Sequence, residues 1–226
     1  MARKTKIDNA KQKRTAIKAR KVGGKLQRQY FLIVCEGTKT EPNYFESIKK
    51  LLPRGVLEFI DIQGTGTNTI SLIEWAEKFR DKEAQNNRKY DQTWAVFDKD
   101  SFPARNFDNA VNKGEDLKDK INCAWTNEAF ELWYLLHFEY VSVGMSREDY
   151  KPLLEKWLTK KTGKSFKYEK NLPDMYDILQ EFGNEKQAIL WAEKLEKGYQ
   201  DKQFSTHNPC TKVHHLIKIL EAQFKK

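Results

Sequence analysis

The chain has 226 residues and a formal net charge of +9, and 39% of its residues are hydrophobic. This length suits one substantial hydrophobic core and is too short for several large independent ones. No stretch approaches the roughly 20 consecutive apolar residues that a membrane-spanning helix needs, so we expect a protein with no membrane partner.

The first 28 residues form a basic segment that differs from the rest of the chain. They contain eleven Lys or Arg and one acid, whereas the other residues hold 30 bases and 31 acids. With few large apolar side chains, residues 1–28 cannot bury enough surface to fold, which predicts a disordered arm attracted to phosphate. A solubilising tail is the alternative. The expected nucleic-acid-binding residues are Arg14, Lys18, Arg20, Lys21, Lys25 and Arg28.

The N-terminal sequence and the cysteines indicate the expected cellular location of the protein. Its basic residues are followed by no apolar stretch before Phe31, unlike a secretory signal peptide, which favours a cytoplasmic location. Three cysteines, far apart in the sequence, indicate reduced thiols rather than a disulfide framework.

Apolar stretches of strand length alternate with helical patterns up to residue 138. The first stretch, Tyr30 to Cys35, is continuous rather than alternating, which indicates a strand buried on both faces. This order predicts an α/β fold with a parallel sheet and right-handed crossovers. The predicted strands are 30–35, 56–62, 93–97 and 121–125, and the predicted helices are 41–52, 70–85, 107–120 and 128–138.

From Arg147 onward only helical patterns are found, at 147–161, 174–181, 185–200 and 209–224. Asn208 before Pro209 is typical of a helix N-cap with proline in the first turn. We therefore predict a basic arm at 1–28, an α/β core at 29–145 and a helical C-terminal subdomain at 146–226 that packs on the core.

Three acids directly follow predicted strands. Glu36 follows the first strand, and Asp98 and Asp100 follow the third. Ligands of open parallel sheets collect beyond the carboxyl ends of the strands, and Asp98 and Asp100 point the same way if the strand continues. Carboxylates that converge there favour a hard cation such as Mg²⁺ or Mn²⁺.

An apolar strand that ends in Glu-Gly and a later one that ends in Asp-x-Asp resemble the Toprim domain of topoisomerases, primases and OLD-family nucleases. The strings FLIVCEGTKTEPNYFE (31–46), NEAFELWYLLHF (127–138) and NPCTKV (208–213) resemble the RloB family, Toprim-like proteins encoded near restriction loci and linked to abortive phage defence. The resemblance covers about Tyr30 to Leu220. It implies a Toprim-like, Rossmann-like core with Glu36 as the invariant glutamate and Asp98 and Asp100 as the metal-binding pair.

The resemblance further implies a metal-dependent nuclease that cleaves RNA or DNA in antiphage defence, with Mg²⁺ or Mn²⁺ as cofactor. Related effectors suggest tRNA as the substrate and an ATPase as a partner that restrains the nuclease. The alternative is a non-catalytic nucleic-acid-binding or nucleotide-binding adaptor of a defence complex. Whether the chain forms a homo-oligomer stays open.

Four further residues are candidates for a functional role. Lys39 could hold a phosphate, and Glu41 could be an outer metal ligand or could simply favour the positive end of a helix. Glu131, in an apolar helix, is a candidate catalytic residue and second-site metal ligand, with a buried ion pair as its rival. His137 could be a general acid or base, although a core histidine is the more frequent finding.

Two other patterns are weaker. His207, Cys210, His214 and His215 have the spacing of zinc ligands, but there is no second Cys or His pair, so we do not expect a structural zinc. We expect Asn208, Lys212 and His214 to form a polar wall near the site instead. The loop at 64–68 could cradle a phosphate through its backbone N–H groups.

Overall fold

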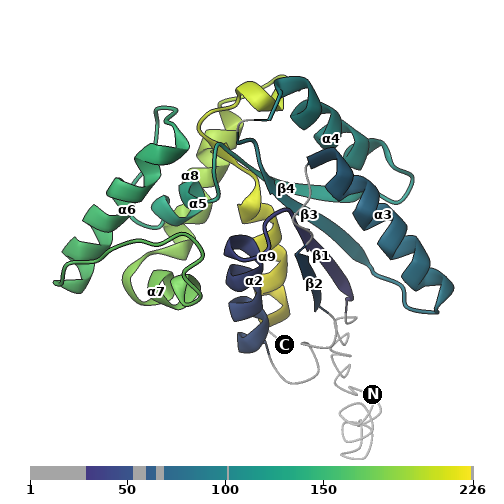
Figure 1. Cartoon of the computed structure of the whole chain (residues 1–226), viewed down its shortest axis with the longest axis horizontal. Coiled ribbons are helices and arrows are strands. Elements are labelled where there is room, and N and C mark those ends of the chain that lie inside the picture. Colours follow the sequence, from purple (N-terminus) through teal and green to yellow (C-terminus); the bar gives the residue numbers. More distant parts are fainter. Residues whose placement is uncertain (1–28, 53–59, 65–68, 101, 225–226) are drawn as a thin grey trace, which may run out of the picture.

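The computed structural model describes residues 29–52, 60–64, 69–100 and 102–224. A five-stranded sheet in the order β2-β1-β3-β4-β5 lies at its centre (Figure 1). The first four strands are parallel, and β5 runs antiparallel to β4. This confirms the predicted α/β class, and the arrangement is consistent with a Rossmann-like fold. The strands are β1 (Phe31–Cys35), β2 (Ile60–Gly64), β3 (Gln92–Asp98), β4 (Ile121–Asn127) and β5 (Cys210–Thr211).

Helices cover both faces of the sheet. On one face lie α3 (Thr69–Gln85) and α4 (Ala104–Asp116), and on the other lie α2 (Thr40–Leu51) and α9 (Val213–Phe224) (Figure 1). Every residue of β1 is buried, as its continuous apolar sequence predicts. Its alternate side chains belong to two separate apolar clusters, one on each side of the sheet.

The remaining α-helices lie on the same side of the sheet as α2 and α9 (left in Figure 1), whereas the short 3-10 helix η2 (Phe204–Thr206) packs against α4. They are α5 (Glu131–Leu135), α6 (Arg147–Thr162), α7 (Met175–Phe182) and α8 (Glu185–Lys197). One continuous apolar cluster joins side chains from Phe31 in β1 to Leu220 in α9. The division at residues 145 and 146 stays a prediction. Among the helices described, none combines the length and the apolar character needed to cross a bilayer.

The C-terminal part is not all helical, contrary to the sequence prediction. Cys210 and Thr211 form β5, which pairs with the end of β4, and the Oγ1 atoms of Thr126 and Thr211 lie 2.9 Å apart. The last helix consequently begins at Val213, so Asn208 is not its N-cap. A two-residue strand is too short to give a periodic pattern, and its pairing partner lies more than 80 residues earlier.

Some predicted features cannot be compared with the structure. The basic segment 1–28, with its six predicted nucleic-acid-binding residues, lies outside the described residues. So do the first residues of the predicted second strand and most of the loop at 64–68.

Candidate metal centre

Glu36 and Asp98 meet at the carboxyl ends of two adjacent strands. Glu36 follows β1 and Asp98 ends β3, and the parallel register of these strands brings them together. The Glu36 N–H donates to the Val96 carbonyl at 2.9 Å, which continues the ladder one residue beyond β1. The Asp98 N–H in turn donates to Glu36 Oε2 at 3.3 Å. The sheet itself therefore fixes the relative position of these two carboxylates.

The Asp98 carboxylate has one oxygen with a hydrogen bond and one without. Its Oδ2 accepts a hydrogen bond from the Phe130 N–H at 3.0 Å, whereas Oδ1 is buried with no hydrogen-bond partner among the described residues. Burial, followed by the charges of Glu41 and Glu131, raises the pKa of Asp98 well above its usual range. Buried polar atoms without a partner are rare in proteins, and a cation against Oδ1 would remove this cost.

Asp100 does not continue the strand. Its φ of 41° places it in the left-handed region, so the condition under which Asp98 and Asp100 were expected to point the same way, a strand that continues to Asp100, is not met. The Asp100 carboxylate forms an ion pair with Arg147, the first residue of α6. Asp98 and Asp100 nevertheless line the same cavity.

Two more carboxylates, those of Glu41 and Glu131, lie near Asp98. Glu41, in the first turn of α2, is 6% exposed, and Glu131, the first residue of α5, is 8% exposed. Neither forms an ion pair within the described parts of the chain, so the predicted buried ion pair of Glu131 is not found there. Its Oε1 instead accepts a hydrogen bond from the Tyr168 hydroxyl at 2.9 Å. Burial and the charge of Glu131 raise the pKa of Glu41.

A cavity of about 730 Å³ lies at the edge of the sheet, and Glu41 lines it together with Glu36, Asp98 and Asp100, whereas Glu131 is not among its lining residues. A Cβ atom at Gly37 would overlap the Glu41 carboxylate, so a larger residue at this position would force the Glu41 side chain to move. Lys39 is exposed at the rim, where a phosphate could reach it. The lining residues are Glu36, Gly37, Thr38, Lys39, Thr40, Glu41, Asp98, Asp100, Phe102, Arg147, Lys170 and Asn171.

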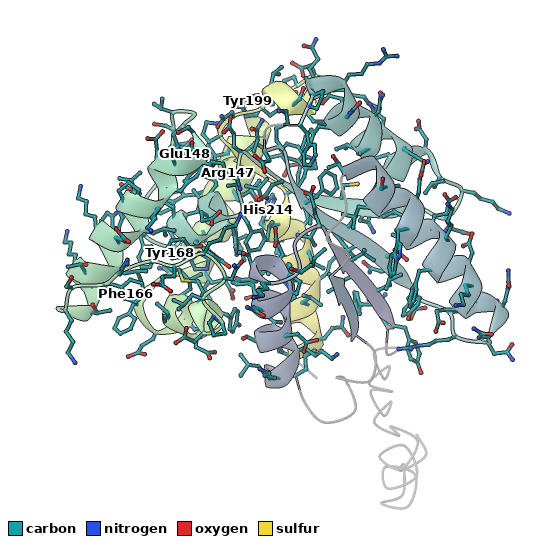
Figure 2. The ribbon with its side chains drawn as sticks, viewed as in Figure 1. Arg147, Glu148, Phe166, Tyr168, Tyr199 and His214 are labelled. Carbon is teal, nitrogen blue, oxygen red and sulfur yellow. The ribbon has the colours of Figure 1, made fainter. Side chains whose placement is uncertain are left out.

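The helical C-terminal part contributes site residues that the sequence reasoning missed. Arg147 and Lys170 line the cavity, and Tyr168 holds Glu131. Arg147 and Tyr168 come from α6 and the segment after it (Figure 2). No motif marks them, because a lone Arg, Lys or Tyr in a helical region has no distinctive spacing. Only the packing of α6 brings them to the ends of the strands.

The oxygen donors are of the kind that a hard divalent cation prefers, but no three of the described acids around this cavity have ligand atoms that all lie within 4.8 Å of one another. Glu36, Asp98 and Asp100 offer carboxylate oxygens on one cavity, and Asp98 has a buried oxygen that lacks a partner. Mg²⁺ and Mn²⁺ prefer such ligands and keep further positions for water or phosphate. The charges of Glu41 and Glu131 add to burial in raising the pKa of Asp98.

The pKa of Glu36 leads to a prediction about pH. Burial raises this pKa from 4.5 to about 7, against the stabilising hydrogen bond from the Asp98 N–H. A raised carboxyl pKa stabilises the metal-free fold below pH 4.5, and that contribution is lost as the pH rises through about 7. Because a metal needs the ionised carboxylate, Mg²⁺ should bind more tightly over the same rise in pH.

Thermal denaturation with and without Mg²⁺ checks this prediction. Between about pH 5 and pH 8 we expect the Tm of the metal-free protein to fall and the Mg²⁺-induced increase in Tm to grow. In Glu36→Gln both trends should be weaker. An Mg²⁺ effect that is equal at every pH would contradict the assignment.

The histidines lie away from this cavity. His137 is buried in the core against the Trp133 ring, with its Nδ1 2.9 Å from the Trp133 carbonyl, and burial lowers its pKa to about 4. It therefore occupies the position of a core histidine. The prediction of a polar wall near the site is wrong, because Asn208, Lys212 and His214 do not line the acidic cavity.

The fold and the site define the class to which the protein belongs: a parallel α/β protein with carboxylates gathered at the carboxyl ends of adjacent strands. Residues 31–220 match the family model described as RloB-like protein, so the chain belongs to the RloB-like family. This confirms the resemblance seen in the sequence. No curated protein and no solved structure matches the chain.

Proposed function

We propose that the protein is a metal-dependent nuclease of the Toprim type that hydrolyses phosphodiester bonds in RNA or DNA. The observation that carries the proposal is the unpartnered, buried Asp98 Oδ1 beside Glu36, in a cavity that also contains the Asp100–Arg147 ion pair. The cavity contains carboxylates that are not all paired with positive side chains, and such carboxylates suit a metal ion. It is also lined by positively charged side chains, which suit a phosphate.

Each residue has a role in this proposal. Glu36, Asp98 and Asp100 would hold Mg²⁺ or Mn²⁺, which when bound activates water and neutralises charge on the phosphate. Lys39, Arg147 and Lys170 line the cavity and would bind phosphate oxygens. Tyr168 orients Glu131 through its hydroxyl and so keeps a further carboxylate facing the cluster.

The substrate and the setting are the finer part of the proposal. The basic residues of segment 1–28 would add attraction to phosphates along a nucleic acid without selecting a sequence. Membership of the RloB-like family supports a role in antiphage defence through the resemblance described above, with tRNA as the first substrate to test. An ATPase partner would then restrain the nuclease until infection.

A cleavage assay with end-labelled nucleic acids tests the proposal. Wild type and the Asp98→Asn/Asp100→Asn variant are incubated with tRNA, single-stranded RNA and duplex DNA, in Mg²⁺, in Mn²⁺ and in EDTA. We expect metal-dependent cleavage of at least one substrate by the wild type, reduced at least about 100-fold in the variant. Metal and nucleic-acid binding without cleavage, also in extracts from phage-infected cells, would instead favour the adaptor.

A further inference from the structure

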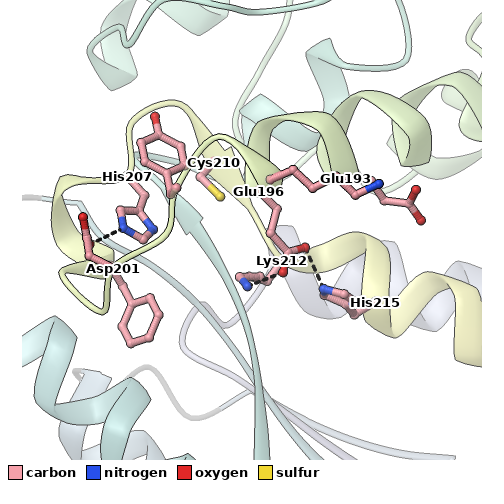
Figure 3. Close-up of a pocket in the computed structure, with 10 residues that line it drawn as sticks. Glu193, Glu196, Asp201, His207, Cys210, Lys212 and His215 are labelled. Carbon is pink, nitrogen blue, oxygen red and sulfur yellow. Dashed lines mark hydrogen bonds and ion pairs between the residues drawn. The ribbon is translucent and has the colours of Figure 1, made fainter.

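A second set of metal ligands lies at the junction of α8 and α9. Glu196 comes from α8, and His214 and His215 come from the first turn of α9 (Figure 3 shows Glu196 and His215). Glu196 Oε2 is 3.1 Å from His214 Nε2 and 2.8 Å from His215 Nε2. One ligand atom from each of the three residues lies within 4.8 Å of the others. The sequence prediction of no zinc site around His214 considered only Cys and His ligands and did not include a carboxylate from another helix.

The surroundings of His214 determine which of its ring nitrogens carries the proton. Its Nδ1 lies 3.1 Å from the Thr211 carbonyl, which can only accept, so Nδ1 is protonated. In the neutral ring Nε2 then presents a lone pair. His214 is 0% exposed, and its Nε2 has no hydrogen-bond partner in the described structure although a carboxylate oxygen is close. The lone pair of the buried His214 Nε2 thus faces Glu196 Oε2, a partly exposed carboxylate oxygen that also lies at hydrogen-bonding distance, 2.8 Å, from His215 Nε2.

A cation between them would remove this conflict. A second proton on His214 is the alternative, in which the ring and the Glu196 carboxylate would form an ion pair without a metal. A metal-bound histidine commonly donates its other N–H to a backbone carbonyl, as His214 does to Thr211. Lys212 Nζ lies 2.5 Å from Glu196 Oε1, which leaves Oε2 to face the two rings.

Two imidazoles and one carboxylate are a ligand set that suits zinc. Tetrahedral ligands at about 2.0–2.1 Å from Zn²⁺ lie roughly 3.3 Å apart, so the separations of Glu196 Oε2 from the two histidines, 3.1 and 2.8 Å, need only a small expansion. We propose that Glu196, His214 and His215 bind one zinc ion. His207 is not part of the site, because its Nε2 is engaged by Asp201 at 2.8 Å (Figure 3).

The zinc site is separate from the acidic cavity. Glu196 and His215 line a different cavity of about 460 Å³, which shares no lining residue with the cavity of Asp98. Three protein ligands would leave a fourth position of a zinc ion for water, and the cavity that Glu196 and His215 line offers room for it. The ion would also tie α8 to the start of α9. The inference does not depend on the proposed nuclease activity.

Zinc binding to the full-length protein tests the inference. The Asp98→Asn/Asp100→Asn protein is used so that the acidic cavity does not compete, and bound Zn²⁺ is measured by equilibrium dialysis and elemental analysis. We expect about one Zn²⁺ per chain, and Co²⁺ in its place should give the visible absorption of a tetrahedral site. His215→Ala and Glu196→Gln should each lower the affinity for Zn²⁺ at least about tenfold.

Glu193→Gln is the matched control. Glu193 lies one turn before Glu196 on α8 and pairs with Lys218 at 2.7 Å, so its loss should leave zinc binding unchanged. The His215 side chain is 44% exposed, so His215→Ala should fold even if a change at Glu196 disturbs the helix pair. No Zn²⁺ binding at micromolar concentration, or full binding in a folded His215→Ala protein, would overturn the inference.

Discussion

Asp98→Asn is expected to abolish metal-dependent cleavage, by at least about 100-fold, and at the same time to raise the Tm of the metal-free protein. The two effects have one cause. Asp98 is crowded by Glu41, Glu131 and Glu36, so its negative charge is costly without a cation and useful with one. Asparagine keeps the acceptor for the Phe130 N–H and removes the charge.

The same variant should lose the increase in Tm that Mg²⁺ or Mn²⁺ produces in the wild type. Asp116→Asn is a matched control, since Asp116 is exposed at the end of α4 and makes the same change of charge. A destabilised metal-free Asp98→Asn protein that still gains stability from Mg²⁺ would show that the metal binds elsewhere.

Arg147→Gln is expected to change metal affinity and cleavage in opposite directions. Arg147 pairs with Asp100 and stands among the acids, so its positive charge competes with a divalent ion. Removing it should tighten Mn²⁺ binding by roughly threefold or more. Cleavage should nevertheless fall by about 10- to 100-fold, because the guanidinium would no longer stabilise charge on the phosphate.

Isothermal titration with Mn²⁺ and the cleavage assay together measure these two effects. Arg105→Gln, in which an exposed cation of α4 is lost, should change neither. If Arg147→Gln weakened Mn²⁺ binding, Arg147 would instead be a residue that positions Asp100 for the metal. Cleavage that stays at the wild-type rate would exclude a role in phosphate binding.

The sequence predicted those parts of the fold and site that depend on local pattern. The continuous apolar run of β1 indicated a strand buried on both faces, and the acids that end β1 and β3 lie together because parallel strands end at one edge. These inferences needed only the pattern of apolar residues along the sequence and the direction of the strands.

Features that depend on distant segments were missed. The pairing of Asp100 with Arg147 joins a left-handed residue after β3 to the start of α6, and neither residue carries a signal of the contact. Glu196 lies 19 residues before His215 in the sequence and on another helix, so a motif of closely spaced ligands could not include it. Tertiary packing, rather than local secondary-structure propensity, brings together the Asp100–Arg147 pair and the cluster of Glu196, His214 and His215.

The most direct test of the metal centre is a crystal structure of the protein with Mn²⁺, with anomalous scattering used to locate the ion. The account predicts an anomalous peak about 2.0–2.3 Å from Asp98 Oδ1, with Glu36 or Asp100 as a further ligand. An acidic cavity without a peak at saturating Mn²⁺, with Asp98 Oδ1 still unpartnered, would contradict it.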